Sequence, residues 1–176
     1  FKSAGYATAS IGKWHLGSGM YYPEKHGFDV NIAGTDKPQP PSYLAPWKIP
    51  TLAEGQTGEY LTDRLGEEAA GFIGRTRDQP FFLYLPLNAP HTPIVPTAEW
   101  QGKSGLNPYA DFVMQVDAEV GKVMAALEKN ELAQSTLLIF TSDNGCSPQA
   151  DFPALRAKGH DPSGGFRGTK ADIFEG

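Results

Sequence analysis

A lysine and a histidine stand two residues apart in the run Gly12-Lys13-Trp14-His15-Leu16-Gly17. In an extended segment, alternation of side chains places Lys13 and His15 on one side and Trp14 on the other. A lysine supplies a positive point charge, and an imidazole can move a proton near neutral pH. The pair is therefore suited to hold an anion and act on it. An edge strand with solvated polar residues and a packed tryptophan gives the same pattern.

Two further motifs offer oxygen ligands and a proton donor. Asp143 and Asn144 bring a carboxylate and an amide oxygen together, which suits Ca²⁺ or Mg²⁺ better than zinc. His91 lies on a loop stiffened by Pro90 and Pro93, from which it could protonate a leaving-group oxygen. Each motif also has a plainer interpretation, because Asp-Asn-Gly is common in turns and a histidine can cap one.

Two more polar residues lie towards the end of the chain. Lys170 follows a glycine-rich stretch near Arg167 and could hold an oxyanion, although most lysines are simply solvated. His160, in Gly159-His160-Asp161-Pro162, is a loop histidine on the residues alone.

The elements that must position these residues are predicted from hydrophobic spacing. Residues 7–14 form a short strand after a helical turn that ends at Gly5. Residues 59–75 and 109–130 have helical spacing. Residues 81–85 and 136–140 are continuous apolar runs, as expected for strands buried on both faces. Strand, helix and strand in this order predict a βαβ unit in an α/β fold with a mainly parallel sheet.

Parallel sheets bind ligands beyond the carboxyl ends of their strands. Lys13 and His15 end the first strand, His91 follows the second, and Asp143 with Asn144 follows the third. We therefore predict that the three motifs converge on one edge of the sheet.

Residues 18–58 are rich in glycine, proline and aromatic side chains, which indicates an ordered surface excursion. Its aromatic residues could stack on a sugar or aryl ring, or they could pack on the domain.

Composition limits the possible classes of protein. The 176 residues fit one ordinary domain, and 40% hydrophobic with 20% charged residues is typical of a soluble globular protein. The net charge of −5 and the lack of a Lys/Arg run argue against a nucleic-acid binder. No apolar stretch is long enough to span a membrane, and no signal peptide is visible. We expect a fragment of a longer protein.

Taken together, the motifs resemble the type I sulfatase family of the alkaline-phosphatase superfamily along nearly the whole chain. The matching segments follow the family's order: Gly5-Tyr6-Ala7-Thr8, Gly12 to Gly17, His26-Gly27-Phe28-Asp29, Pro90-His91-Thr92-Pro93, Thr141-Ser142-Asp143-Asn144-Gly145, Arg167-Gly168-Thr169-Lys170 and Phe174-Glu175-Gly176. The resemblance implies an incomplete three-layer α/β/α sandwich with a mainly parallel central sheet. Residues 1–176 would be the central part of one catalytic domain.

The resemblance also implies a role for each candidate residue. Lys13 and Lys170 would contact the sulfate, and Asp143 and Asn144 would bind one calcium ion. His15 would act on the hydrate of a formylglycine nucleophile and help break down the sulfated intermediate. His91 would assist departure of the ester oxygen, and His160 would line the substrate pocket.

Parts of the family pattern are absent from this sequence. The formylglycine signature, the N-terminal aspartate pair of the calcium site and the C-terminal subdomain have no match in residues 1–176. Cys146-Ser147-Pro148 begins like the Cys-x-Pro-x-Arg signal, but its fifth position is Ala150, so we interpret Cys146 as structural or incidental. We expect the fragment alone to be inactive, with the remaining calcium ligands and the formylglycine outside it.

For the intact protein, the resemblance implies hydrolysis of a sulfate ester on a sulfated small molecule or glycan. It also implies export to the periplasm, the extracellular space or the lysosome, and it leaves the oligomeric state open. One alternative is a phosphatase or phosphodiesterase of the same superfamily, although Asp-Asn in place of Asp-His favours one metal. Another is a non-catalytic protein that binds sulfated glycans on a sulfatase scaffold. The intact candidate positions do not support that alternative, and the upstream signature would decide.

Overall fold

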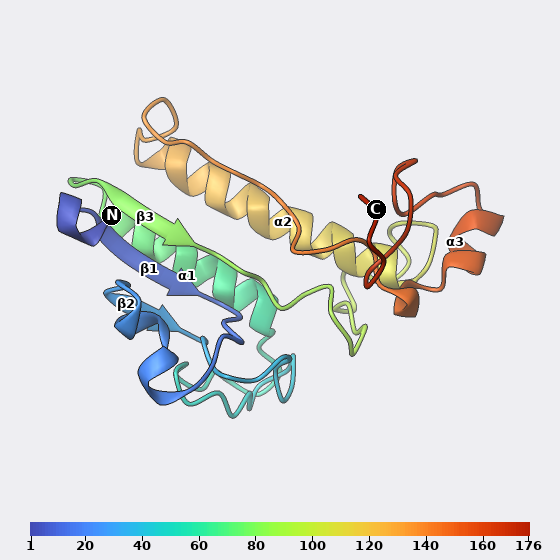
Figure 1. Ribbon diagram of the computed structural model, residues 1–176, viewed down its shortest axis with the longest axis horizontal. Helices are drawn as coiled ribbons and strands as arrows, with labels where there is room; N and C mark the ends of the chain where they lie inside the picture. Colours follow the sequence, from blue (N-terminus) through green and yellow to red (C-terminus); the bar gives the residue numbers. More distant parts are fainter. The chain divides into compact units, whose positions relative to one another are not determined.

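The computed structural model describes residues 1–176, which separate into two compact units (Figure 1). The first unit comprises residues 1–89 and 116–136, and the second comprises residues 90–115 and 137–176. Each unit is described by itself below. None of the helices is both long and apolar enough to cross a membrane.

The first unit is built on a parallel sheet of three strands in the order β2-β1-β3. The central strand β1 (Ala7–Ile11) pairs with β2 (Val30–Ile32) on one side and with β3 (Phe81–Tyr84) on the other. Ala9 lies opposite Val30 and Leu83 in the two registers. The predicted α/β class with parallel strands is confirmed, although the first strand ends at Ile11 and not at residue 14.

Helix α1 (Leu61–Arg75) packs against β1 and supplies the core of the first unit (Figure 1). Its helical spacing was the basis of the prediction over 59–75, and the whole apolar stripe is buried: Leu61, Leu65, Ala69, Phe72 and Ile73. Together, β2, α1 and β3 make a crossover between two strands that both pair with β1.

Helix α2 (Pro108–Lys129) matches the predicted helix over 109–130, and it contributes residues to both units. Val123 and Leu127 of the predicted apolar stripe are buried, whereas Val113 and Met124 are exposed. The stripe is therefore narrower than the spacing predicted.

The predicted strand over 136–140 is wrong. These residues form no regular secondary structure, and all four apolar side chains are exposed, Leu137 by 85%. The βαβ unit predicted between residues 81 and 140 is therefore absent, and β3 is half-buried where both faces were expected to be covered. An apolar run indicates only that its side chains favour burial, and it does not show that the backbone pairs with another strand. A strand forms where a neighbour supplies backbone hydrogen bonds, and 136–140 pairs with none of β1 to β3.

Short helices were predicted poorly. The turn at the start of the chain is the 3-10 helix η1 (Lys2–Ala4), which Gly5 ends in the left-handed conformation as expected. Two further 3-10 helices, η2 (Gly19–Tyr21) and η3 (Pro23–Lys25), lie in the excursion after β1. In the second unit, η4 (Pro148–Ala150) and α3 (Phe152–Ala157) replace part of the expected loop. The signal for α3 was Asp151, whose carboxylate accepts a hydrogen bond from Ala154 N, with proline in the first turn.

A buried carboxyl group lies where α2 meets α1 within the first unit. The Glu119 side chain is 2% exposed, and its Oε1 pairs with Lys122 Nζ at 2.8 Å. A Cβ atom at Gly66 of α1 would overlap Glu119 Oε2, so glycine at this position makes room for the carboxyl. Burial raises the pKa of Glu119 to about 7, opposed by Lys122 and reinforced by the nearby Asp63 carboxyl.

This carboxyl makes stability depend on pH. Folded Glu119 keeps its proton up to pH about 7, whereas the unfolded chain releases it near 4.5, so stability falls as pH rises between these values. We expect Glu119→Gln to reduce this fall in the free energy of unfolding by on the order of 2 kcal/mol, because glutamine does not titrate. Thermal unfolding at pH 5 and pH 8 measures it. Glu128→Gln, at an exposed position of α2, is the control. An equal pH dependence in wild type and Glu119→Gln would contradict the assignment.

Candidate functional site

The backbone that follows β1 is held between the ends of its two neighbours. Gly12 N donates to Ile32 O at 2.8 Å, and Lys13 N donates to Pro86 O at 2.7 Å. The even spacing of hydrogen bonds along parallel strands places Lys13 at the carboxyl edge of the sheet, as the sequence predicted. Gly12 has φ +121°, and a Cβ there would overlap the Pro86 carbonyl oxygen, so only glycine fits.

The expectation that the strand continues to residue 14 is wrong. Positive φ angles at Gly12 and at His15 (φ +55°) turn the chain, so the alternation argument for Lys13 and His15 does not apply. His15 N donates to Thr35 O at 2.8 Å, which stabilises this turn. Lys13 is half-buried and the His15 side chain is exposed at the sheet edge.

Trp14 forms the base of this loop. Its indole N–H donates to Tyr21 O at 2.7 Å, and its ring lies 5.9 Å from the His26 ring and 6.0 Å from the Phe28 ring. The plainer interpretation, a packed tryptophan, therefore holds for Trp14. Its packing anchors the segment that carries Lys13 and His15.

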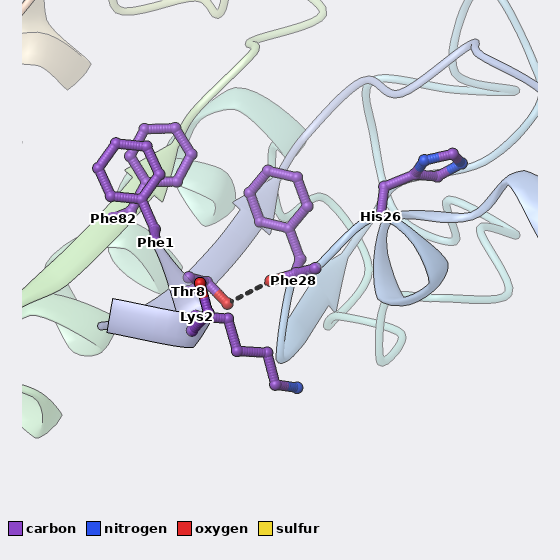
Figure 2. A pocket seen from close by; sticks show the side chains of 8 residues that line it. Phe1, Lys2, Thr8, His26, Phe28 and Phe82 are labelled. Carbon is purple, nitrogen blue, oxygen red and sulfur yellow. Dashed lines mark hydrogen bonds between the residues drawn. The ribbon is translucent and has the colours of Figure 1, made fainter. Parts of the chain in front are cut away.

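The motif His26-Gly27-Phe28-Asp29 acts at the other end of β1. Asp29 accepts hydrogen bonds from Thr8 N and Thr8 Oγ1, at 3.2 and 2.9 Å, and pairs with Lys2 at 2.5 Å. The hydrogen bond from Lys2, together with those from Thr8, holds the pKa of Asp29 below its ordinary value. Thr8 Oγ1 also lies 2.9 Å from Gly27 O, the contact drawn in Figure 2. This motif therefore ties β1 to the segment before β2.

A cavity of about 530 Å³ lies beside this motif. Figure 2 shows the Phe1 and Phe82 rings stacked at one side and Lys2 and His26 at its rim. None of the predicted site residues lines it. The cavity is near the start of β1, whereas ligand chemistry in parallel sheets occurs at the carboxyl end.

In the second unit, His91 has one ring nitrogen held by the backbone. Its Nδ1 lies 3.0 Å from the Thr92 carbonyl oxygen, and the ring is half-buried. Nδ1 also lies 3.3 Å from Thr92 Oγ1. It is a donor towards the carbonyl and an acceptor towards the hydroxyl, according to the tautomer of the ring.

The segment with Asp143 and Asn144 lies against the segment with Lys170. Cys146 O accepts a hydrogen bond from Lys170 N at 3.0 Å, and a Cβ at Gly145 would overlap the backbone of Gly176. The second unit therefore brings Asp143 and Asn144 into a segment that neighbours the one with Lys170. Lys170 is half-buried.

Asp143 and Asn144 themselves are exposed. The Asn144 Nδ2 atom donates to Gly145 O at 2.9 Å, which uses the amide nitrogen and not the oxygen that a hard cation takes. No group of three or more His, Cys, Asp or Glu side chains in residues 1–176 could hold a metal. Because Ca²⁺ takes about six to eight oxygen ligands, this pair fits calcium as part of a larger ligand set.

His160 and Cys146 have plainer environments. His160 is exposed, and its backbone N–H donates to Leu155 O at 3.0 Å at the end of α3. Cys146 is half-buried beside Tyr109, and burial raises the pKa of its thiol. The thiol therefore stays protonated near neutral pH, in agreement with the structural interpretation.

The predicted convergence of the three motifs with Lys13 and His15, His91, and Asp143 and Asn144 on one edge stays a prediction. Lys13 and His15 belong to the first unit, and the remaining candidates belong to the second: His91, Asp143, Asn144, His160 and Lys170. Within each unit, the structure places the candidates on turns or loops. Only the first unit has a sheet edge that supports them.

The fold is of the alkaline-phosphatase-like α/β class shared with solved sulfatases. The crystal structure of Ps i-CgsB in complex with k-i-k-neocarrahexaose has 30% identity and a TM-score of 0.74, over 97% of this chain and 42% of its own. A sulfatase structure from work on metabolism of multiple glycosaminoglycans by Bacteroides thetaiotaomicron has 27% identity and a TM-score of 0.77, over 99% of this chain and 51% of its own.

The chain belongs to the Sulfatase family, whose model matches residues 1–169. N-acetylgalactosamine-6-sulfatase from Mus musculus is 34% identical over 165 residues, covering 83% of this chain and 32% of that protein. N-acetylgalactosamine-6-O-sulfatase from Bacteroides thetaiotaomicron is 28% identical, covering 99% of this chain and 48% of that protein. The predicted resemblance is confirmed. The chain spans about a third to a half of the curated relatives it matches.

The close approach of Gly12 to Pro86 generates a prediction. We expect Gly12→Ala to destabilise the protein by about 2 to 4 kcal/mol, because it adds a steric overlap to an unfavourable φ. Gly5→Ala is the matched control, since Gly5 has φ +81° with nothing within 4 Å of a Cβ, and we expect a cost of about 1 kcal/mol. Urea unfolding measures both. Equal costs would show that the Pro86 contact is unimportant.

Proposed function

We propose that the protein to which this chain belongs hydrolyses a sulfate ester. Family membership supports the reaction class. The observation that carries the site is the pair of backbone hydrogen bonds from Gly12 and Lys13 to the ends of β2 and β3. They hold a cation and a neighbouring imidazole at the sheet edge where ligands of this fold class bind.

The two lysines would bind the sulfate group. Lys13 stands at the sheet edge, and Lys170 lies beside the Asp143–Asn144 segment through its hydrogen bond to Cys146. Each positive charge would neutralise the charge on the sulfuryl oxygens as the ester bond breaks. Lys13 needs little reorganisation for this role, because its backbone is fixed and its side chain is half-buried.

The two histidines would move protons. The His91 ring, whose Nδ1 lies beside the Thr92 carbonyl, would give a proton to the departing ester oxygen. His15 is exposed on its turn, where it would exchange a proton with the nucleophile. We propose that this nucleophile is a formylglycine from a part of the protein outside residues 1–176.

Asp143 and Asn144 would hold one calcium ion together with ligands outside residues 1–176. When bound, the ion supplies positive charge beside the sulfate and raises the electrophilicity of the sulfur. His160 would lie on the side of the organic group.

We propose a sulfated carbohydrate as the substrate and an exported location, in the periplasm, the extracellular space or the lysosome. Two relatives are N-acetylgalactosamine-6-sulfatases, and one solved relative holds k-i-k-neocarrahexaose. These names support a sugar as the organic part of the ester.

The reaction is tested with the full-length protein. We expect sulfate release from sulfated carbohydrates. We expect Lys13→Ala to lower kcat/KM by at least about 100-fold, because the substitution removes a positive charge that neutralises the sulfate group. Lys25→Ala removes an exposed lysine of the same unit and serves as control. Preferred hydrolysis of phosphate esters would favour the phosphatase alternative. Binding of sulfated glycans without turnover would favour the non-catalytic one.

The cation is tested by metal analysis of the purified full-length protein. We expect one calcium per chain, and we expect Asp143→Ala to lose the metal and most of the activity, with partial recovery at high calcium. Asp117→Ala, at an exposed position of α2, should keep both. Two transition-metal ions per chain, or an Asp143→Ala variant with full calcium content, would contradict the assignment.

A further inference from the structure

The excursion of residues 18–58 has five aromatic side chains, and their environments differ. Tyr43 and Trp47 are buried in the core, whereas Tyr22 and Phe28 are half-buried. Tyr21 is 54% exposed. The choice between packing and ring stacking is thus made residue by residue, and Tyr21 is the aromatic of this excursion with most of its surface available.

The position of Tyr21 is fixed although its ring is exposed. Its carbonyl accepts the Trp14 indole N–H at 2.7 Å, and its own N–H donates to Ser18 O at 3.1 Å. A Cβ at Gly17 would stand 2.8 Å from Tyr21 Cβ and 3.2 Å from two ring carbons, so the ring packs on the bare Gly17 backbone. Little conformational freedom remains for a ligand to restrict.

The same hydrogen bond closes residues 14–21 into a loop that contains His15. Two other large apolar side chains of this loop are exposed, Leu16 by 68% and Met20 by 71%. The loop therefore presents three apolar side chains immediately after Lys13 and His15. Apolar surface beside a few polar groups is typical of ligand-binding sites.

We propose that Tyr21 forms the platform for the sugar ring that carries the sulfate ester, with Leu16 and Met20 at its margin. This proposal rests on the proposed function. A sugar ring has C–H groups on its face and hydroxyl groups at its edge. A tyrosine ring offers a matching apolar face. The occupant follows from continuity with the sulfate-binding pair, since a ring attached to that sulfate must lie beside it.

The test uses the full-length protein and a sulfated oligosaccharide that it hydrolyses. We expect Tyr21→Ala to raise KM roughly 10-fold and to change kcat less than about 3-fold, while Tyr21→Phe keeps a wild-type KM. Inhibition by inorganic sulfate should be unchanged, because sulfate needs the cationic pair and not the platform. Tyr22→Ala, the half-buried neighbour, is the matched control and should not reproduce this selective effect.

Several outcomes separate this proposal from the function on which it rests. Sulfate release with a wild-type KM in Tyr21→Ala would overturn the platform alone. A parallel loss of inorganic-sulfate inhibition would show that Tyr21 only holds the loop, and would also overturn it. A wild-type protein without sulfate release refutes the proposed function. Calorimetric binding of the oligosaccharide to wild type and Tyr21→Ala then tests the platform, and equal affinities refute it.

Discussion

The central place of β1 is the constraint on which the first unit depends. A parallel strand pairs with it on each side, so the carboxyl ends of all three strands lie at one edge. The hydrogen bonding continues one step beyond the strand, through Gly12 and Lys13 to the ends of β2 and β3. Backbone hydrogen bonds thereby set the position of Lys13. Such hydrogen bonds hold a residue more firmly than contacts made by an exposed side chain.

The rest of the first unit fixes β1 in this position. Asp29 ties the start of β1 to the chain before β2, through hydrogen bonds from Thr8 and the ion pair with Lys2. The apolar stripe of α1 covers β1, and Gly66 makes room for the buried Glu119 of α2. A strand held at both ends and covered on one face is a rigid support for a charged residue at its end.

The second unit is held together in a different way. Its loops depend on side chains that bind backbone groups: Asp111 accepts from Gly102 N and Ser104 N at 2.7 and 2.8 Å, and Asn107 donates to Ala150 O at 2.7 Å. Lys158 donates to Gly105 O at 3.0 Å. A glycine-rich stretch has few side chains for a core, so such contacts replace packing. These polar residues were not singled out from the sequence, because a polar side chain that organises a loop looks like a solvated one.

Local patterns in the sequence determined the two long helices, the cap at Gly5 and the order of the motifs that place the chain among sulfatases, because helix periodicity and capping depend on residues a few positions apart. Contacts between distant residues decided the rest. Residues 136–140 have the composition of a buried strand but no neighbour to pair with. The chain turns at His15, which has a positive φ and donates its backbone N–H to Thr35 O. Tyr21 and Trp47 occur in the same aromatic-rich excursion, yet Tyr21 is exposed and Trp47 is buried. Strand pairing, backbone turns and burial depend on contacts with residues far apart in the chain, and the local spacing of residue types does not identify those residues.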